Sequence, residues 1–267
     1  MENLEILKEQ LAHYASEGLT LAFSGGTDSS LLLALAAQTG YPVRAVLFHS
    51  QLMPLRDADI AARVAAECGV PLDTLEIDVT TSREVMRNDP RRCYFCKRAI
   101  FRRLRAWSAE RGLPHLADGT NADDLKVYRP GLQALRELGV HSPLAECGFT
   151  KAEVRAAAAQ LGLSVASRPS APCMATRLPY GTALDFSVLR RLEQGEEALH
   201  GLGFPVCRLR LHGNVVRIEV PADRIGDLAA VRDTVLAALK PLNFPYYTLD
   251  LTGFRSGSMD IEVDRHG

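Results

Sequence analysis

A short apolar run, a glycine turn and a second apolar run constrain the fold of this chain most. Residues 19–23 read Leu-Thr-Leu-Ala-Phe, the turn reads Ser24-Gly25-Gly26-Thr27-Asp28-Ser29, and residues 29–37 are rich in leucine and alanine. The two glycines let the backbone approach a ligand closely because they carry no Cβ. The N–H groups in the first turn of a helix have no partner within the helix and attract anions. The pattern predicts a buried strand, then a turn, then a helix whose N-terminus binds a phosphate.

Strand and helix patterns alternate through the first part of the chain. Apolar runs typical of strands occupy residues 19–23, 43–48, 74–79 and 115–117. Helical patterns occupy residues 4–17, 29–39, 55–67 and 94–111. This alternation predicts an α/β fold with a doubly wound parallel sheet that has helices on both faces. Ligands of such sheets bind at the carboxyl ends of the strands, so the Ser24–Ser29 turn, Ser50 and Asp118–Asn121 are expected at one edge.

A different pattern begins at residue 150. Thr150 and Glu153 form a capping box that starts a helix running to about Leu161. Residues 164–184 carry three prolines and no clear periodicity. Beyond them we expect a helix, two strands, a helix and a strand, at residues 185–200, 206–211, 214–220, 222–239 and 245–251. This order predicts a smaller α+β domain, and we place the division between residues 1–182 and 183–267.

The composition is that of an ordinary globular protein, with 47% hydrophobic and 24% charged residues among 267. The net charge of −1 and the lack of a long basic run argue against a nucleic-acid partner, which needs clustered Lys and Arg. The acidic, amphipathic start is unlike a secretion signal, and no apolar run is long enough to span a membrane. We therefore expect a cytoplasmic protein whose six cysteines are free, metal-bound or catalytic rather than disulfide-bonded.

Two cysteine motifs are the second candidate for chemistry. Residues 92–97 read Arg-Cys-Tyr-Phe-Cys-Lys and contain a CxxC pair, Cys93 and Cys96, while Cys173 stands in the proline-rich stretch. A CxxC pair supplies two thiolates to one metal or cluster, and it also occurs as two half-buried cysteines on a helix. Three cysteines on a [4Fe-4S] cluster would leave one iron open to an exogenous ligand such as sulfide. The remaining cysteines match no motif and are expected to be buried small residues: Cys68, Cys147 and Cys207.

The pattern SGGxDS of the turn resembles the PP-loop of the ATP pyrophosphatase superfamily, in which ATP is split between its α- and β-phosphates. Further segments extend the resemblance over nearly the whole chain, to the LarE family of ATP-dependent sulfur transferases. That family builds the nickel-pincer nucleotide cofactor of lactate racemase. The segments are Arg92–Lys97, Asp118–Asp124, Arg129–Gly131, Cys173–Gly181, Arg208–Gly213, Val216–Val220 and Gly253–Met259.

The resemblance implies a reaction. A carboxylate of pyridinium-3,5-biscarboxylic acid mononucleotide attacks the α-phosphate of ATP, and pyrophosphate leaves. Sulfur then displaces AMP from the acyl-adenylate to give a thiocarboxylate. One form of the family sacrifices the sulfur of a cysteine at the position of Cys173. Another form carries three cysteines and is thought to hold a [4Fe-4S] cluster that delivers sulfide from a donor, and the three motif cysteines favour this form here.

The resemblance also implies partners and residue roles. Residues 1–182 are expected to form the PP-loop domain, which uses ATP and Mg²⁺, and residues 183–267 a substrate and oligomerisation domain of a homo-oligomer, by family a hexamer. The expected catalytic residues are Cys173, Asp28 and Lys97, and the expected cluster ligands are Cys93, Cys96 and Cys173. Substrate is expected at Arg177, Arg208, Arg210 and Arg255, of which Arg208 and Arg210 alternate on one strand and share a face. ATP is expected at Ala22, Phe23, Ser24, Gly25, Gly26, Thr27, Asp28, Ser29, Ser50, Gly119, Thr120, Asn121 and Asp123.

Other hypotheses remain open at this point. A tRNA thiolation enzyme of the same superfamily combines a PP-loop with a CxxC and a third cysteine, and it adenylates a base oxygen instead of a carboxylate. An ammonia-dependent ligase would need no set of three cysteines. A nucleotide-binding regulator without activity would release no pyrophosphate in the presence of the biscarboxylate substrate.

Overall fold

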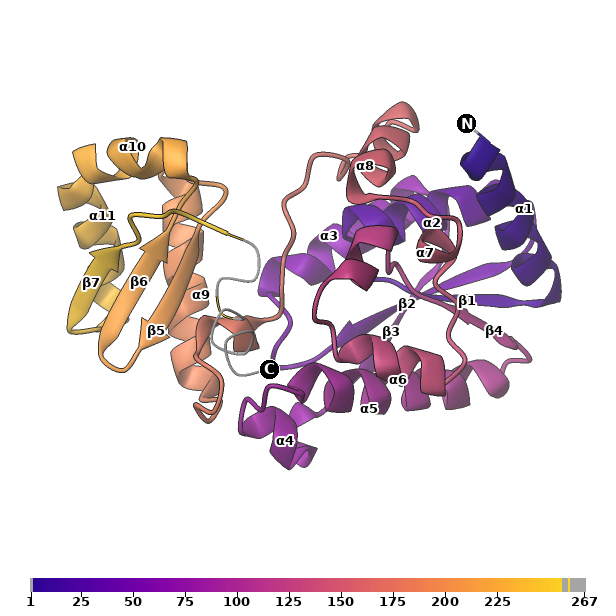
Figure 1. Cartoon of the computed structure of the whole chain (residues 1–267), viewed down its shortest axis with the longest axis horizontal. Helices are drawn as coiled ribbons and strands as arrows, with labels where there is room; N and C mark the ends of the chain where they lie inside the picture. The colour runs from indigo at the N-terminus through magenta and orange to yellow at the C-terminus, as the bar shows by residue number, and fades with distance from the viewer. Residues whose placement is uncertain (1, 256–258, 260–267) are drawn as a thin grey trace. The chain divides into compact units, whose positions relative to one another are not determined.

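The computed structural model describes residues 2–255 and Met259 (Figure 1). Their contacts form two compact units. The first, called unit 1 below, runs to Ser82 and resumes at Arg91–Ala171; the second, unit 2, contains Arg83–Pro90 and the chain from Pro172 onward. The functional division predicted at residue 182 stays a prediction.

Unit 1 is built on a parallel sheet in the order β3-β2-β1-β4. Its strands are β1 (Leu19–Ala22), β2 (Val43–His49), β3 (Leu72–Glu76) and β4 (His115–Ala117). The strand expected at 74–79 begins and ends earlier. Asp78 accounts for the earlier end, because its side chain accepts the Thr80 N–H at 3.0 Å and caps the 3-10 turn η1 (Val79–Thr81).

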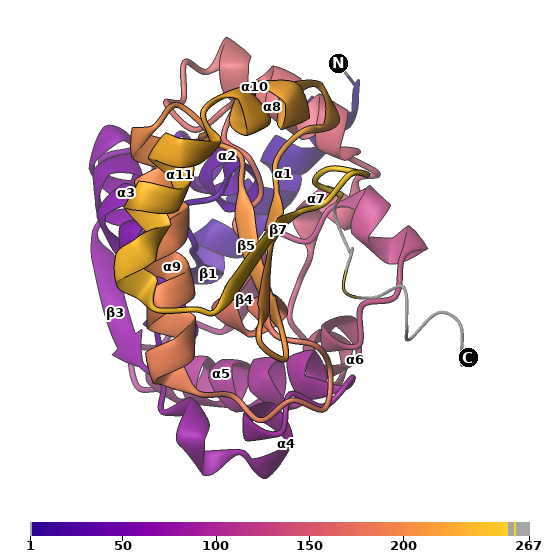
Figure 2. The same cartoon turned by 90° about the vertical axis from the view of Figure 1, so that its left-hand side faces the viewer.

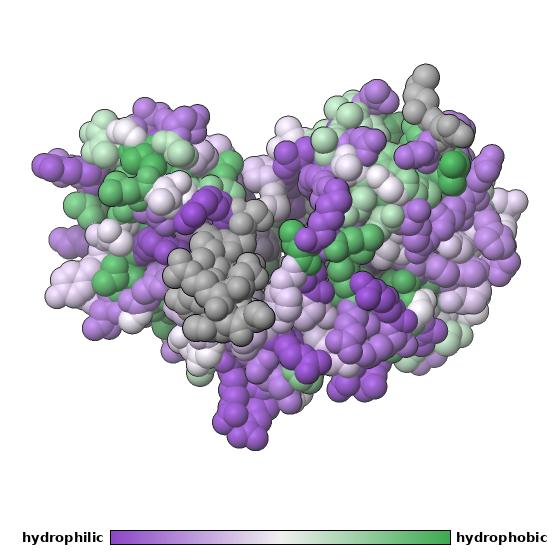
Figure 3. Space-filling model, viewed as in Figure 1, coloured by the Kyte–Doolittle hydropathy of each residue, from purple (hydrophilic) through white to green (hydrophobic). Residues whose placement is uncertain are grey.

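Helices cover both faces of this sheet, which confirms the predicted doubly wound α/β fold (Figure 1). One face carries α1 (Glu2–Glu17), α2 (Thr27–Ala37), α3 (Leu55–Glu67), α7 (Pro143–Glu146) and α8 (Lys151–Gln160), whose apolar side chains share one core with the sheet. The other face carries α5 (Arg92–Ala109) and α6 (Gly131–Glu137), which bury a second core. The outer surface over α5 and α6 is mostly hydrophilic (Figure 3). Helices α6 and α7 and the 3-10 turn η2 (Ala122–Lys126) were not predicted from the sequence.

Unit 2 contains a three-stranded sheet in the order β5-β6-β7, and it confirms the predicted α+β pattern. Strand β5 (Arg208–His212) is antiparallel to β6 (Val215–Glu219), and β7 (Tyr246–Leu249) is parallel to β6. Helices α9 (Phe186–Gly201) and α11 (Arg232–Leu239) lie side by side against the sheet (Figure 2). The helix expected at 222–239 is divided into η4 (Ala222–Arg224), α10 (Ile225–Ala230) and α11. The break between α10 and α11 lies at Val231, which leaves the helical conformation. The remaining elements are α4 (Arg83–Met86), η3 (Met174–Arg177) and η5 (Lys240–Leu242).

Among the described residues, no helix is both long and apolar enough to cross a membrane.

Candidate active site

The Ser24–Ser29 turn joins the carboxyl end of β1 to the first turn of α2. Gly26 is the N-cap of α2, and the Ser30 N–H donates to the Gly26 carbonyl at 3.0 Å as the first bond of the helix. The N–H groups at positions 27–29 therefore have no carbonyl acceptor within the helix, whereas the N–H groups of Ser24 and Gly26 donate to the Ser29 and Ser24 hydroxyls at 3.3 Å. The Ser24 and Ser29 hydroxyl oxygens lie 3.2 Å apart in the same turn. Backbone N–H groups, hydroxyls and the positive end of the helix dipole together make an anion site.

Close contacts at this turn require two glycines. Gly25 has a φ of +67°, and a Cβ there would lie 2.8 Å from the backbone of Ala61 in α3. Gly119 follows β4 and passes so near the turn that a Cβ would lie 3.0 Å from the Ser29 backbone nitrogen. The turn is therefore held between α3 and the segment after β4, and a side chain at either glycine would displace it.

Asp28 is the centre of a polar cluster beside the turn. The Asn121 side-chain amide donates to one Asp28 oxygen at 3.0 Å, and the Lys151 ammonium donates to the other. The Lys151 backbone N–H donates to the Asp123 carboxylate at 2.9 Å. That bond and the Lys126 ammonium hold the pKa of Asp123 below its usual range. The structure thus brings Asp28, Asn121 and Asp123 together around a lysine that was not identified from the sequence.

The Lys97 ammonium, from α5, reaches the carboxyl end of β4, and Ser50 lies at the carboxyl end of β2, with β1 between these two strands in the sheet. The Lys97 ammonium is 3.2 Å from the carboxylate of Asp118, which directly follows β4. Asp118 also accepts the hydroxyls of Thr120 at 2.7 Å and Ser142 at 2.8 Å, so its orientation is fixed. Ser50 follows β2, and its hydroxyl accepts the Leu52 N–H at 3.3 Å. Ala22 ends β1, and Phe23 is buried, with its N–H donated to the Val46 carbonyl at 2.8 Å.

Hydrogen bonds connect the chain after α8 to the Ser24–Ser29 turn. The buried Thr27 hydroxyl donates to the Val165 carbonyl at 2.8 Å. Arg168 donates to the Gly25 carbonyl at 3.1 Å and pairs with Asp57 of α3 at 2.5 Å. These contacts fix the conformation of the turn from a segment more than a hundred residues away in sequence.

The Cys173 segment of unit 2 is held by two arginines and an asparagine. Cys173 is exposed and is the N-cap of η3. Arg177 donates to the Pro172 carbonyl at 3.1 Å, and Arg210 donates to the Thr176 carbonyl at 2.7 Å. Asn88 is fully buried with a φ of +52°, and its amide donates to the carbonyls of Leu178 and Pro179 at 3.1 and 2.9 Å. The backbone around Cys173 is therefore fixed on several sides.

The same arginines form buried ion pairs. Arg177 makes two parallel bonds of 2.8 Å to Glu196, and Arg210 bonds Glu219 at 2.8 Å. Burial, with the Arg177 charge nearby, lowers the pKa of Arg208, and burial also lowers the pKa of Arg210. Arg208 donates to the Cys207 carbonyl at 2.6 Å, and Arg255 is exposed. Arg177 and Arg210 are thus charge-paired within the protein by Glu196 and Glu219, and a substrate role for these arginines stays a prediction.

The cysteine pair lies in unit 1, in the first two turns of α5, where Cys93 and Cys96 are both partly buried. Three thiols provide the donor chemistry that an iron–sulfur cluster takes. Within the part of the chain that the structure describes, no three His, Cys, Asp or Glu side chains are grouped to hold a metal ion. Cys207 is buried as expected, while Cys68 and Cys147 are only partly buried.

Three residues that support the site were not predicted from the sequence: Lys151, Arg168 and Asn88. Lys151 lies inside the predicted capping box, so its position at the start of a helix was predictable, but its approach to Asp28 was not. Arg168 and Asn88 reach groups that are distant in sequence, and no local pattern marks them.

Comparisons with known proteins agree with this geometry. Residues 19–89 match the family model described as queuosine biosynthesis protein QueC. The chain is 38% identical, over 91% of its own length and 88% of the relative, to the pyridinium-3,5-bisthiocarboxylic acid mononucleotide synthase of Lactiplantibacillus plantarum. The chain belongs to the LarE family.

An uncharacterized protein of Synechocystis is a second full-length relative, 35% identical over 90% of this chain and 91% of the relative. The tRNA-specific 2-thiouridylase MnmA of Xanthobacter autotrophicus is 30% identical over only 58% of this chain and 50% of its own length. As a LarE family member that matches a synthase along nearly its whole length, the chain is an enzyme.

Proposed function

We propose that this LarE family enzyme is an ATP-dependent sulfur transferase that converts the carboxylates of pyridinium-3,5-biscarboxylic acid mononucleotide to thiocarboxylates. The observation that carries the proposal is the full-length match to a synthase named for the bisthiocarboxylic product. The anion site at the N-terminus of α2 supports it independently, because that site suits the pyrophosphate of ATP.

The activation half of the reaction is proposed for unit 1. A substrate carboxylate attacks the α-phosphorus of ATP, the bond from that phosphorus to the bridging oxygen breaks, and pyrophosphate departs into the Ser24–Ser29 turn. Donors that are already oriented stabilise the charge that develops on the leaving group without reorganising. Asp28 is the proposed partner of Mg²⁺, and Lys97, oriented by Asp118, is the proposed cation beside the reacting phosphate.

The sulfur half is proposed for the three motif cysteines. Sulfur attacks the acyl carbon, and AMP leaves with the former carboxylate oxygen on its phosphate. Cys93, Cys96 and Cys173 are the proposed ligands of a [4Fe-4S] cluster, which when bound would supply an open iron for a sulfide ligand. Cys173 is exposed, and its backbone is fixed by Arg177, Arg210 and Asn88, which favours a chemical role for its thiol.

The other expected roles belong to this proposal too. Residues 183–267 are the proposed substrate and oligomerisation region of a homo-oligomer, with Arg177, Arg208, Arg210 and Arg255 toward the anionic groups of the substrate. Sulfide from a donor or the sulfur of Cys173 itself is the proposed source of the transferred atom.

Acceptor-dependent release of pyrophosphate tests the proposal. Enzyme purified without oxygen is mixed with ATP and Mg²⁺, and pyrophosphate is followed with the biscarboxylate mononucleotide, with unmodified tRNA, or with neither. We expect release only with the mononucleotide. Release with tRNA alone would instead support a thiouridylase, the second candidate, which is favoured by the partial match to MnmA.

Iron and sulfide analysis of the same preparation separates the two sulfur sources. A cluster enzyme contains iron and acid-labile sulfide and keeps its mass after turnover. An enzyme without iron that loses the mass of hydrogen sulfide from Cys173 is sacrificial.

A further inference from the structure

Helix α5 carries more positive charge than the composition of the chain predicts. Six of its 18 residues are Arg or Lys and none is Asp or Glu, whereas the whole chain holds 31 basic and 32 acidic residues. Arg92 is buried and Lys97 pairs with Asp118, so four arginines remain for the outer side of the helix. That side belongs to the hydrophilic outer surface over α5 and α6 (Figure 3).

Three of these arginines, called the basic row below, line one face of the helix. Arg98, Arg102 and Arg105 are spaced by four and three residues, which places them side by side over about 10 Å. Arg102 and Arg105 are exposed, and among the described residues neither forms an ion pair. The row is therefore a run of positive charge that is open to a partner.

Helix stability does not explain the basic row. Like charges three or four residues apart on a helix repel, and positions in the middle of a helix gain nothing from its dipole. The nearby carboxylate of Glu137 is already engaged, because it accepts the Tyr94 hydroxyl at 2.9 Å and the Gln133 amide at 2.7 Å. Those two bonds, with the charges of Arg98 and Arg102, hold the pKa of Glu137 below its usual range. A carboxylate shared in this way balances only part of the charge of the row.

The size and chemistry of the basic row favour an acidic protein surface as its partner. Specific protein–DNA interfaces bury roughly 1,000 Å² or more and neutralise many phosphates, whereas this row offers three arginines. The net charge of −1 gives the whole chain no long-range attraction for a nucleic acid. Guanidinium groups form paired hydrogen bonds with carboxylates, and arginine is enriched at protein interfaces.

We propose that the basic row is the docking surface of an acidic protein that carries sulfur to the cysteine pair of the same helix. Arg98 follows Cys96 by two residues, so a protein seated on the row lies beside the start of α5. This inference rests on the proposed function, in which Cys93 and Cys96 take part in sulfur transfer. If the carrier holds its sulfur as a persulfide, a dithiol supplies two electrons to the S–S bond, hydrosulfide leaves, and the carrier thiol takes up a proton.

Photo-crosslinking in the cell tests the docking without any need for turnover. A benzophenone side chain is placed in the full chain at position 106, where Ala106 is exposed beside the row. We expect a crosslink to an acidic protein. Changing all three arginines to glutamate (Arg98→Glu, Arg102→Glu and Arg105→Glu, the reversed-row variant) should lower its yield about tenfold or more. A crosslink to a nucleic acid, or no crosslink, would show that the inference is wrong.

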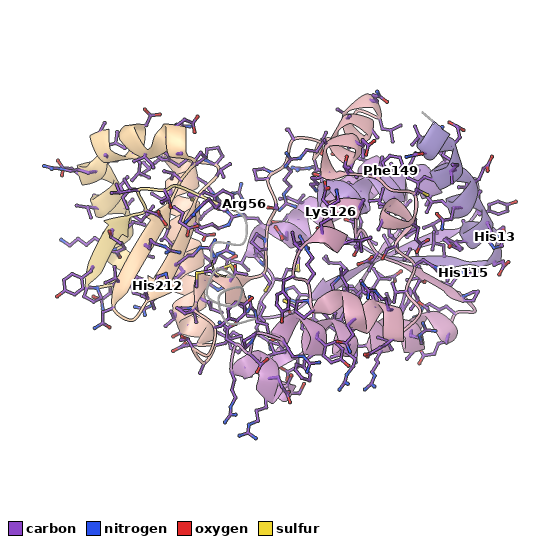
Figure 4. All side chains as sticks on the ribbon, viewed as in Figure 1. His13, Arg56, His115, Lys126, Phe149 and His212 are labelled. Carbon is purple, nitrogen blue, oxygen red and sulfur yellow. The ribbon has the colours of Figure 1, made fainter. Side chains whose placement is uncertain are left out.

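A second triple variant, Lys8→Glu, Arg63→Glu and Arg155→Glu, is the matched control because it changes the net charge equally. These side chains belong to α1, α3 and α8, on the opposite face of the sheet, where Figure 4 labels His13 of α1 and Arg56 of α3. Lys8 and Arg63 are 40% and 60% exposed. The crosslink yield should change by less than about twofold in this variant. Thermal melting of both triple variants shows that the fold is retained.

The crosslinked protein must also deliver sulfur. Purified enzyme is given ATP, Mg²⁺, the biscarboxylate mononucleotide and equal low-micromolar sulfur, either as free sulfide or as persulfide on the captured protein with a dithiol. The reversed-row variant should form thiocarboxylate about tenfold more slowly with the carrier and at an unchanged rate with free sulfide. Equal rates with the carrier in the reversed-row and unmodified enzymes would contradict the inference. If the unmodified enzyme forms no product from free sulfide, the proposed function is wrong, and the crosslink still decides whether the row docks a protein.

Discussion

Replacing Gly25 with alanine should damage both the fold and the anion site, for two separable reasons. Gly25 has a φ of +67°, a conformation that costs a residue with a Cβ about 1–2 kcal/mol. Its new Cβ would also lie 2.8 Å from two backbone atoms of Ala61, so α3 or the turn must move. Such overpacking typically costs about 1–3 kcal/mol, which gives about 2–5 kcal/mol in total.

Gly40→Ala isolates the first reason from the second. Gly40 has a φ of +77°, and a Cβ at this position would meet nothing within 4 Å, so the variant should lose only the conformational part, about 1–2 kcal/mol. Urea unfolding followed by circular dichroism measures both losses, and pyrophosphate titration measures the site. We expect Gly25→Ala to unfold more easily than Gly40→Ala and to bind pyrophosphate at least about tenfold more weakly, because the displaced N–H donors no longer converge. Equal losses of stability in the two variants, with unchanged pyrophosphate affinity, would refute the reasoning.

Three further predictions concern buried and titrating groups. Arg177→Met breaks a buried ion pair and should lower the free energy of unfolding, measured in urea, by about 3–5 kcal/mol. Arg190→Met breaks a pair whose arginine is 49% exposed and should lower the free energy of unfolding by less than about 1 kcal/mol. Similar losses in the two variants would contradict the argument from burial. Burial raises the pKa of Cys68 to about 11 and that of Cys207 to about 12, and it also raises the pKa of Cys147. Iodoacetamide at pH 8 should therefore label the exposed Cys173 before these three cysteines, as measured by peptide mass spectrometry. Labelling of Cys207 before Cys173 would contradict this prediction. Burial lowers the pKa of His141, so below about pH 6.5 the unfolded chain binds more protons than the folded chain does. The melting temperature should therefore fall from pH 7.5 to pH 5.5, and it should fall less in His141→Phe. An equal pH dependence of the two melting temperatures would show that His141 does not contribute to this loss of stability.

Local sequence patterns predicted the elements that local physics determines. The β1–turn–α2 unit follows from an apolar strand, two glycines and an apolar helix, and the capping box at Thr150 and Glu153 is present with both of its bonds. Strand β3 was placed too late because the apolar pattern continues to Val79, while Asp78 turns the chain before it.

Side-chain contacts between segments that are distant in sequence could not be predicted from these local patterns. Lys151 and Asp28 are separated by 123 positions, and Arg168 and Gly25 by 143. Arg210 was predicted from its place on a strand, but the sequence did not show that its guanidinium is held by Glu219 and by the Thr176 carbonyl. In the first turn of α2 the residue types are enough to indicate an anion site, whereas the charges that surround it depend on how α8 packs.

The LarE-type sulfur transfer is tested most directly by the mass of its product. Enzyme kept free of oxygen is incubated with ATP, Mg²⁺, sulfide and pyridinium-3,5-biscarboxylic acid mononucleotide, and the small molecules are analysed by mass spectrometry. We expect a mononucleotide in which sulfur has replaced a carboxylate oxygen, formed together with AMP and pyrophosphate and absent when Cys173→Ala replaces the unmodified enzyme. An unchanged mononucleotide, with ATP consumed or not, would contradict the proposed function.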